Sequence, residues 1–336
     1  MGRPGDGNSG NAADKATVII VTYKGDGLLE ACLDSMERHC AVFPETVVVD
    51  NANLESTRAL VSRHPGVSYI PLDGNRGFAG GSMAAYPSCG REYVILLNND
   101  TVLTGDAVTP LVEFMDSHPA CAAAQGKVVL ASNGETDGCG AFLSPLGILA
   151  FSGAEDDFAH RVFAVGGAFF IARRSAVDAA GGLFHAHFGS YYEEIDLSCR
   201  LAVAGFECWY APVNPPVLHA HSATAGKVDW RGIRRRYYRN IWFSTLTCFG
   251  PLARLRLLVP ITLLSCLQSL AAAVKLDFWL AKAHIASFLT PFRERRLVAE
   301  TRKKIASFRK RTDRQILSFA IRRQKFSYYR NLMKRG

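Results

Sequence analysis

The 336-residue sequence predicts an α/β protein with a doubly wound, mostly parallel sheet, followed by a helical, apolar and basic C-terminal region. Three observations support this prediction. Between residues 17 and 117, short apolar runs rich in β-branched residues alternate with stretches of helical periodicity. After residue 229 the strand-like runs stop. From residue 291 to the end, sixteen Lys and Arg face three Asp and Glu, so most of the net charge of +9 belongs to the tail.

The alternation predicts elements along the whole first two thirds of the chain. We expect strands at 17–23, 46–50, 67–72, 93–98, 122–130, 207–210 and 217–221. We expect helices at 28–38, 55–63, 82–86, 106–117, 175–180 and 193–204, with a glycine loop before the third. The glycine-rich stretch 131–172 suggests hairpins laid against the sheet edge.

Residues 1–15 are rich in Gly, Asn, Asp and Ser and lack an apolar stretch, which predicts a disordered leader and no signal peptide. The nine cysteines form no C-x-x-C pair. Most have apolar neighbours, which predicts reduced core thiols in a cytosolic protein. These are Cys32, Cys121, Cys199, Cys208, Cys248 and Cys266.

Polar residues follow four predicted strands of the first half. They are Thr22 and Tyr23, Asp50, the loop 74–81, and the run Asn98-Asn99-Asp100. Each alone is common in a turn or a helix cap. The carboxyl ends of parallel strands meet at one sheet edge, where ligands bind, so four together predict a binding site. Asp100 there can hold a divalent cation and, through it, a diphosphate.

These elements resemble the family-2 glycosyltransferases of the GT-A fold, in particular the branch containing rhamnosyltransferases. Residues 18–23 match the family's V-x-V-T-Y, and 47–51 match V-V-V-D-N. Residues 75–81 match N-x-G-F-A-G-G letter for letter. The resemblance implies a catalytic domain over 16–228, with a nucleotide-binding half (16–130) and an acceptor half (131–228). A membrane-associating helical region at 229–336 would follow.

The resemblance also implies roles for single residues. Asp100 would hold Mg²⁺ or Mn²⁺ bridging the diphosphate of the donor, and glycines 77–81 would let the backbone close over the nucleotide. The residues expected to bind the nucleotide are Thr22, Tyr23, Asp50, Asn75, Arg76, Gly77 and Asn98.

Residues 191–201 are similar to the family's Y-x-E-D-x-D-L-x-x-R-L segment, whose second acid is the general base. Glu194 stands where the family has Asp, and its side chain is one methylene longer. Glu193 and Asp196 therefore remain alternatives for the base. Further on, 217–224 resembles a stretch whose His lies near the metal. His219 matches that residue, and His221 would share its strand face.

The segment 257–274 has eighteen uncharged residues, interrupted by Pro260. Its length is compatible with a buried helical hairpin, an interfacial membrane element or a spanning helix. The basic tail favours the interface, because Lys and Arg clusters attract anionic lipid. No nucleic-acid-binding motif accompanies the charge, so we expect no nucleic acid partner.

Together these features predict a metal-dependent, inverting glycosyltransferase at the cytoplasmic face of the cell membrane. The expected donor is dTDP-rhamnose or a UDP-sugar, and the expected acceptor is a glycan or lipid-linked acceptor of a cell-surface polysaccharide. A non-catalytic sugar- or nucleotide-binding protein and a sugar-1-phosphate nucleotidyltransferase are the alternatives. A nicotinamide dehydrogenase is disfavoured, because the glycine loop follows the third strand and not the first.

Overall fold

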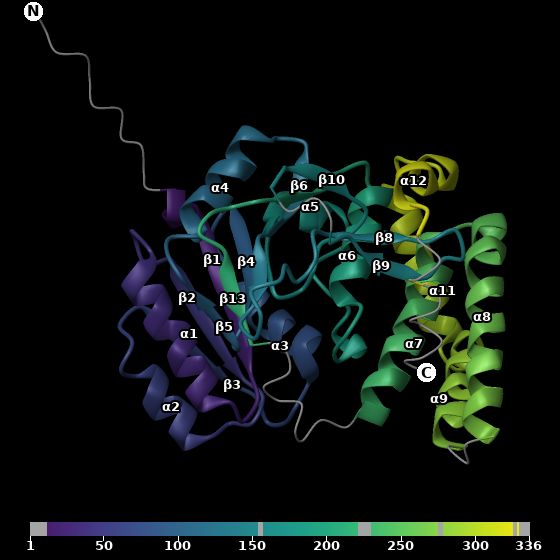
Figure 1. Ribbon diagram of the computed structural model, residues 1–336, viewed down its shortest axis with the longest axis horizontal. Coiled ribbons are helices and arrows are strands. Elements are labelled where there is room, and N and C mark those ends of the chain that lie inside the picture. Colours follow the sequence, from purple (N-terminus) through teal and green to yellow (C-terminus); the bar gives the residue numbers. More distant parts are fainter. Residues whose placement is uncertain (1–11, 154–156, 221–229, 275–277, 325–327, 329–336) are drawn as a thin grey trace, which may run out of the picture.

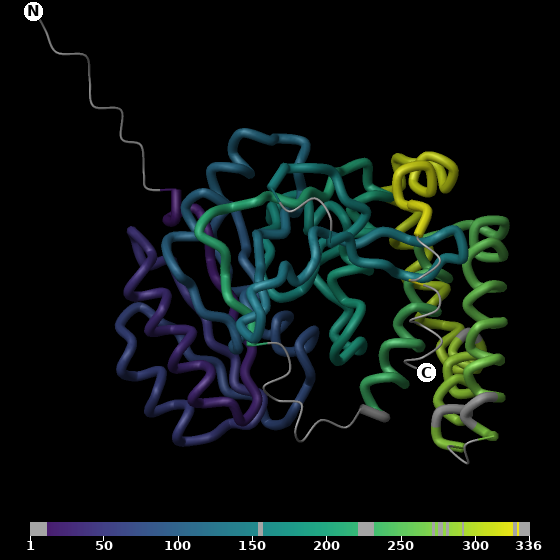
Figure 2. Tube along the Cα trace, viewed as in Figure 1, coloured from purple at the N-terminus to yellow at the C-terminus, as the bar shows by residue number. Residues whose placement is uncertain are grey.

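The computed structural model describes residues 12–153, 157–220, 230–274, 278–324 and 328. An α/β domain and a group of C-terminal helices lie side by side (Figures 1 and 2). The predicted leader 1–15 falls mostly outside the described residues, and so does His221.

The central sheet has eight strands in the order β10-β12-β6-β11-β4-β1-β2-β3. Its parallel part consists of β1 (Ala16–Thr22), β2 (Glu45–Asp50), β3 (Val67–Pro71) and β4 (Tyr93–Asn98). The helices that alternate with these strands are α1 (Asp26–His39), α2 (Glu55–Val61), α3 (Gly77–Ala85) and α4 (Val108–Ser117). The predicted α/β class with a parallel-rich sheet is confirmed.

Two cores lie on opposite faces of the sheet, because successive strand residues point to opposite sides. Val18 and Ile20 of β1 pack with apolar residues of α1, α2 and α4. Ile19 and Val21 pack on the other side with α3 and α6 (Glu193–Val203). Both faces are covered, as expected of strands with continuous apolar runs.

The second half is mixed in strand direction. β11 (Phe169–Arg173) runs antiparallel between β4 and β6 (Cys121–Gly126), in the middle of the sheet. The expectation of hairpins at the sheet edge is therefore wrong for 169–173, because the apolar run Phe-Phe-Ile-Ala is buried as a central strand. The other strands are β12 (Glu207–Ala211), β10 (His160–Val162), the hairpin of β8 (Ala141–Leu143) and β9 (Leu149–Phe151), and a small sheet of β5 (Thr101–Leu103), β13 (Val217–His219) and β7 (Val128–Leu130).

The third helix differs from the prediction, because α3 begins inside the glycine loop and not at residue 82. Gly81 lies against β1, where a Cβ would come within 2.6 Å of the Val21 side chain. A Cβ at Gly80 would meet Arg76 at the same distance. The glycines therefore allow this helix to approach the strand closely, besides turning the chain.

The C-terminal helices pack against the second half of the sheet domain, including α6 (Figure 1). They are α7 (Trp230–Cys248), α8 (Pro251–Val274), α9 (Phe278–Phe288), α10 (Thr290–Arg293), α11 (Arg295–Phe308) and α12 (Asp313–Ala320). The remaining short helices are η1 (Ala12–Lys15), η2 (Tyr86–Ser88), α5 (Arg174–Ala179) and η3 (Ala186–Phe188).

Part of the basic tail holds these helices to the sheet domain. Arg311 donates to the Phe206 carbonyl at 2.5 Å, whereas Arg309 donates to the Cys248 carbonyl of α7, within the helical group itself. Lys304 reaches the Gly181 carbonyl at 2.9 Å. These three basic side chains are therefore engaged within the protein and are not available to an external partner. All nine cysteines are free; Cys266 is exposed on α8, so the prediction of a core thiol is wrong there.

Candidate active site

A cavity of about 830 Å³ lies at the carboxyl ends of β1, β2 and β4. Strand register explains why: Thr22 pairs with Asp50 across β1 and β2, and Val21 pairs with Asn98 across β1 and β4. The predicted site residues on the cavity wall are Thr22, Tyr23, Asn75, Gly77, Asn98, Asp100, Glu193, Glu194 and His219. Asp50, Arg76 and Asp196 lie off the wall.

The Asp50 carboxylate is fully buried and shapes the loop after β2. It accepts hydrogen bonds of 2.8 Å from the backbone N–H groups of Ala52 and Leu54, and one of 2.9 Å from the Tyr69 hydroxyl. Burial and the Asp50 charge raise the pKa of Tyr69 to about 12. The next residue, Asn51, lies on the cavity wall instead.

Asn51 fixes the glycine loop that was expected to bind the nucleotide. Its side-chain oxygen accepts from the Arg76 N–H at 3.0 Å, and its amide donates to the Gly77 carbonyl at 3.2 Å. Asn75 accepts from the Gly77 N–H at 2.8 Å. Gly77 has a φ of +71°, and a Cβ there would come within 2.3 Å of the Gly189 carbonyl oxygen. Glycine is thus required both by conformation and by close approach.

Asp100 and His219 meet because β13 pairs antiparallel with β5, with His219 opposite Thr101. The His219 Nε2 atom lies 3.2 Å from Asp100 Oδ1, and its Nδ1 atom lies 2.6 Å from Asp137 Oδ2. Burial alone would lower the pKa of His219, but hydrogen bonds to the two carboxylates raise it to about 9.

Asp137 is a cavity residue that the sequence analysis missed. It follows no predicted strand and stands in a glycine-rich stretch, so position alone gave no signal. Asn51 and Asn99 were also not assigned roles, although both line the cavity. Asn99 donates to the Thr22 hydroxyl at 3.1 Å and so ties two strand ends together.

The residues around Asp100 fit a hard divalent cation. Neighbouring ligand atoms of an octahedral site with bonds of about 2.1 Å lie about 3 Å apart, close to the 3.2 Å between Asp100 Oδ1 and His219 Nε2, and His219 would become a ligand by giving up the Nε2 proton that it donates to Asp100. Asn98 offers a further oxygen on the same wall. A second acidic group, Asp34, Glu37 and His64, also has ligand atoms close together. This group lies off the cavity. A 2.8 Å contact between His64 and Glu37 connects the first two helical segments, and we assign the group no role in metal binding.

Glu193 and Glu194 begin α6, and both line the same cavity. Burial raises the pKa of Glu194 to about 7. Burial and the neighbouring charge of Glu194 hold the pKa of Glu193 well above its usual range. Two buried adjacent carboxyls do not both ionise readily, so one proton remains on the pair near neutral pH.

A strained loop leads into these acids. Tyr191 and Tyr192 both have a left-handed backbone, with φ of 75° and 80°. Asn240 of α7 holds this loop, because its buried side-chain amide donates to the carbonyls of Phe188 at 3.1 Å and Tyr191 at 2.8 Å. Strain of this kind persists only where surrounding contacts fix it, and it is common at functional sites.

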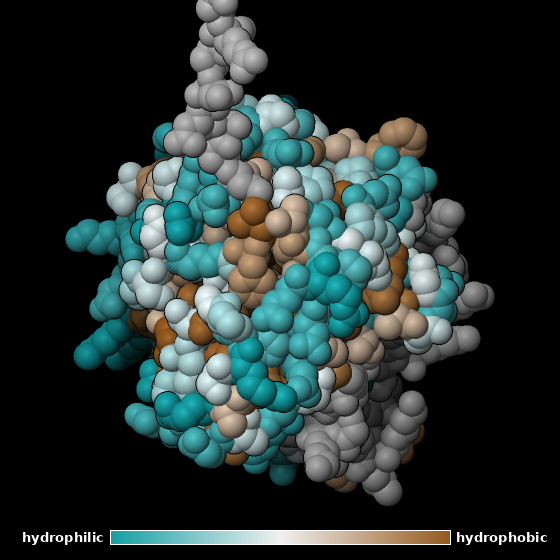
Figure 3. Space-filling view, turned by 90° about the vertical axis from the view of Figure 1, so that its left-hand side faces the viewer, coloured by the Kyte–Doolittle hydropathy of each residue, from teal (hydrophilic) through white to brown (hydrophobic). Residues whose placement is uncertain are grey.

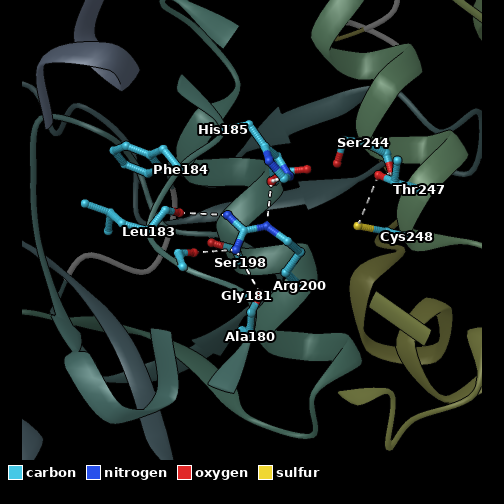
Figure 4. A network of polar contacts seen from close by, with 12 residues as sticks. Ala180, Gly181, Leu183, Phe184, His185, Ser198, Arg200, Ser244, Thr247 and Cys248 are labelled. Carbon is cyan, nitrogen blue, oxygen red and sulfur yellow. Dashed lines mark hydrogen bonds and ion pairs between the residues drawn. The ribbon is translucent and has the colours of Figure 1, made fainter. Parts of the chain in front are cut away.

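Asp196 is bound by Arg200, whose buried network with neighbouring carbonyls is shown in Figure 4. The Asp196 carboxylate forms an ion pair with Arg200 Nε at 2.7 Å. Burial alone would raise the pKa of Asp196, but the positive charge of Arg200 outweighs this effect and lowers the pKa. Arg200 also donates to the carbonyls of Ala180, Gly182 and Leu183. This geometry favours a structural role for Asp196 and leaves Glu193 and Glu194 as the acids that face the cavity.

The sequence of this domain matches a known family. Residues 17–180 match the family model for glycosyl transferase family 2. The succinoglycan biosynthesis protein ExoO of Rhizobium meliloti (strain 1021) is 26% identical over 122 residues, which cover 36% of this chain and 35% of ExoO. The match thus spans about a third of that relative. These matches support a family-2 glycosyltransferase.

Solved structures show the same GT-A fold at low identity. S. aureus TarS 1–349 has a TM-score of 0.57 at 15% identity, and the alignment covers 94% of this chain and 92% of that one. GalNAc-T7 with UDP, GalNAc and Mn²⁺ has a TM-score of 0.56 at 14% identity, covering 69% of this chain and about half (48%) of its own. The mannosyltransferase PcManGT from Pyrobaculum calidifontis, with GDP-Man and Mn²⁺, has a TM-score of 0.50 at 16% identity, covering 87% and 79%. At these identities the family-2 assignment rests on the sequence matches.

Proposed function

We propose that this chain is an inverting glycosyltransferase that moves a sugar from a nucleotide-diphosphate donor to a hydroxyl of a glycan or lipid-linked acceptor in cell-surface polysaccharide synthesis. The observation that carries the proposal is one cavity lined by Asp100, His219 and Glu194 together. A donor diphosphate and an acceptor hydroxyl need these two kinds of group on opposite sides of the reacting carbon.

Glu194 is the proposed general base. The acceptor oxygen forms a bond to the anomeric carbon while the bond from that carbon to the diphosphate oxygen breaks, and Glu194 takes the hydroxyl proton. A base with a pKa of about 7 is matched to this task at neutral pH. Glu193, with its higher pKa, keeps the shared proton and stays neutral. A single displacement inverts the anomeric configuration.

Thr22, Tyr23, Asn75, Gly77 and Asn98 are proposed to hold the nucleotide, since they line the wall at the strand ends. Asp50 and Arg76 act on that wall indirectly, through the loops that they shape. Asp100 and His219 would hold Mg²⁺ or Mn²⁺, which when bound neutralises charge on the departing diphosphate. The neighbours solved with UDP or GDP-Man and Mn²⁺ support this choice.

The test is donor turnover by purified protein. We expect hydrolysis or transfer with one member of a panel of dTDP-rhamnose, UDP-sugars and GDP-mannose, dependent on Mg²⁺ or Mn²⁺ and abolished by EDTA. NMR of the first-formed product would show the inverted anomer. Binding of a donor without any turnover would instead favour a non-catalytic sugar-binding protein. Release of pyrophosphate from a nucleoside triphosphate and a sugar phosphate would favour a nucleotidyltransferase.

The proposed place of action is the cytoplasmic face of the cell membrane, where lipid-linked acceptors are assembled. Among the described residues, one helix is long and apolar enough to cross a membrane, over Pro251–Leu270, and 28% of that stretch is buried. The curated relative acts in succinoglycan biosynthesis by its name, which supports a polysaccharide acceptor.

A further inference from the structure

An apolar stripe runs along the whole outer side of α8. Its members are large hydrophobic residues that are 44–85% exposed, namely Leu252, Leu255, Val259, Leu263, Leu267, Leu270 and Val274. They are spaced three or four residues apart, so they lie on one face of the helix. No described residue covers this face, and α8 lies on the outside of the molecule (Figure 1). Exposed apolar patches of this size mark interaction sites.

The other side of α8 is fixed to the protein. Leu257 and Ile261 are buried, and the backbone of Leu257 passes so close to Gly147 that a Cβ there would be 3.0 Å from its carbonyl oxygen. His284 of α9 makes contacts of 2.9 Å with the Ser265 carbonyl and 2.8 Å with the Ser269 hydroxyl. A helix bound along one side in this way cannot cross a bilayer without losing those contacts.

The next two helices also expose large apolar side chains. Phe278 and Ile285 of α9 are exposed, seven residues apart and so on one face of that helix, and so are Leu289, between the two helices, and Phe292 of α10. Lys282 is exposed at the same helical spacing, three residues before Ile285. A basic side chain among exposed aromatic and aliphatic residues is typical of segments at a membrane surface.

The charges next to the stripe favour an anionic partner. Helices α8, α9 and α10 contain no Asp or Glu, whereas Arg256, Lys282 and Arg293 on them are exposed. Arg295 and Arg296 follow after Glu294, which is paired with Arg239, and are exposed as well. A second copy of this chain docked through the same face would bring these cations together, which is unfavourable. Anionic lipid headgroups complement them.

We infer that α8 lies flat on an anionic bilayer, with its leucine stripe in the headgroup region and α9 and α10 beside it. The face of the molecule that carries α1 and α2 is mainly hydrophilic, with apolar residues in smaller groups, and would point away from the membrane (Figure 3). The membrane contact itself does not depend on the proposed function. Its expected benefit does, since the contact would bring the cavity to a lipid-linked acceptor.

Vesicle co-sedimentation tests the inference on the full chain. Wild-type protein should bind vesicles containing phosphatidylglycerol more than pure phosphatidylcholine vesicles, and high salt should release part of it. The variant L263E/L267E/L270E should bind at least about tenfold less, since burial of each leucine is worth a factor of about ten. The matched control S56E/A59E/S62E adds the same charge on exposed positions of α2 and should bind as wild type.

The readouts separate this inference from the proposed function. Metal-dependent donor turnover with a soluble acceptor, or donor hydrolysis, should be equal in all three proteins, which also shows that the variants fold. Equal vesicle binding by wild type and the leucine variant would overturn the membrane inference and leave the enzyme proposal standing. A wild-type dimer in light scattering that the leucine variant converts to monomer, without vesicle binding, would overturn it in favour of self-association.

Discussion

The two walls of the cavity are built by different means. On the wall at the strand ends, which we propose binds the nucleotide and call the nucleotide wall, Thr22 and Asn98 are placed by strand register, which follows from the sheet itself. On the other wall, Glu193 and Glu194 follow a left-handed loop that α7 holds from outside the sheet domain. Half of the site thus comes from local sequence pattern, and the other half depends on a helix that is distant in the sequence.

The C-terminal helices therefore also position residues of the site. Asn240 and Arg239 of α7 donate to the carbonyls of His187, Phe188 and Tyr191, and Arg239 is itself fixed by a 2.7 Å ion pair with Glu294. Gly189 in turn accepts from the Ala79 N–H of the glycine loop at 2.8 Å. The same helical region that carries the apolar stripe therefore also supports both walls.

The largest expected effect lies on the nucleotide wall. We predict that Asp100→Asn lowers kcat by about 10³-fold with little loss of folding, because metal-assisted departure of the diphosphate is worth several kcal/mol. Thermal stabilisation by Mn²⁺ plus donor should disappear as well. Asp106→Asn removes the same charge from a helix cap off the cavity and should keep full turnover. Near-normal activity of Asp100→Asn at saturating Mn²⁺ would place the metal elsewhere.

A weaker variant at the same wall sharpens this test. Asp137→Asn should lower the affinity for Mn²⁺ about 10- to 100-fold, because Asp137 orients His219 through Nδ1. Titration of Mn²⁺ by its EPR signal in the absence of donor measures this directly. An unchanged affinity in Asp137→Asn, together with a lost one in Asp100→Asn, would show that His219 is not a ligand.

The next effect lies on the acid wall. We predict that Glu194→Gln lowers kcat by about 10²-fold or more while donor affinity survives. In wild type, kcat/KM should fall as pH drops below about 7, since the base must be ionised and burial raises the pKa of Glu194 to that value. Glu193→Gln and Asp196→Asn should be less impaired in kcat at pH 8. A dead Asp196→Asn that remains folded, beside an active Glu194→Gln, would reassign the base.

Disruption of the support from α7 should cost less. We predict that Asn240→Leu lowers kcat by about tenfold with donor KM nearly unchanged, because the loop before Glu193 loses its two buried hydrogen bonds. Tyr238→Phe on the same helix removes only a 3.4 Å contact to Gln268 and serves as the control. If donor KM rises tenfold in Asn240→Leu and kcat does not change, the loop supports the nucleotide wall more than the base.

The sequence could predict the strands of the parallel part of the sheet, most helices and the meeting of polar residues at the strand ends, because these follow from periodicity and from the geometry of parallel strands. It could not predict β11 in the centre of the sheet, since pairing partners of an apolar run are not encoded locally. Asp137 reaches His219 only through tertiary contact, and Asn240 lies in a helix that looked like an appendage. The inward orientation of Glu193 and Glu194, as opposed to Asp196, likewise depends on packing around Arg200.

The smallest effect concerns stability. The pKa of Glu193 is raised in the folded protein by burial and by Glu194, so the folded state holds a proton that the unfolded state loses above the ordinary carboxyl range. Stability must then fall as pH rises from that range through the raised pKa. Glu193→Gln removes this cost, and its Tm should exceed that of wild type by about 2 °C or more at pH 8, with a smaller difference at pH 5. Thermal melts across this range measure it, and a difference that does not change with pH would show that the Glu193 carboxyl is not held neutral by burial.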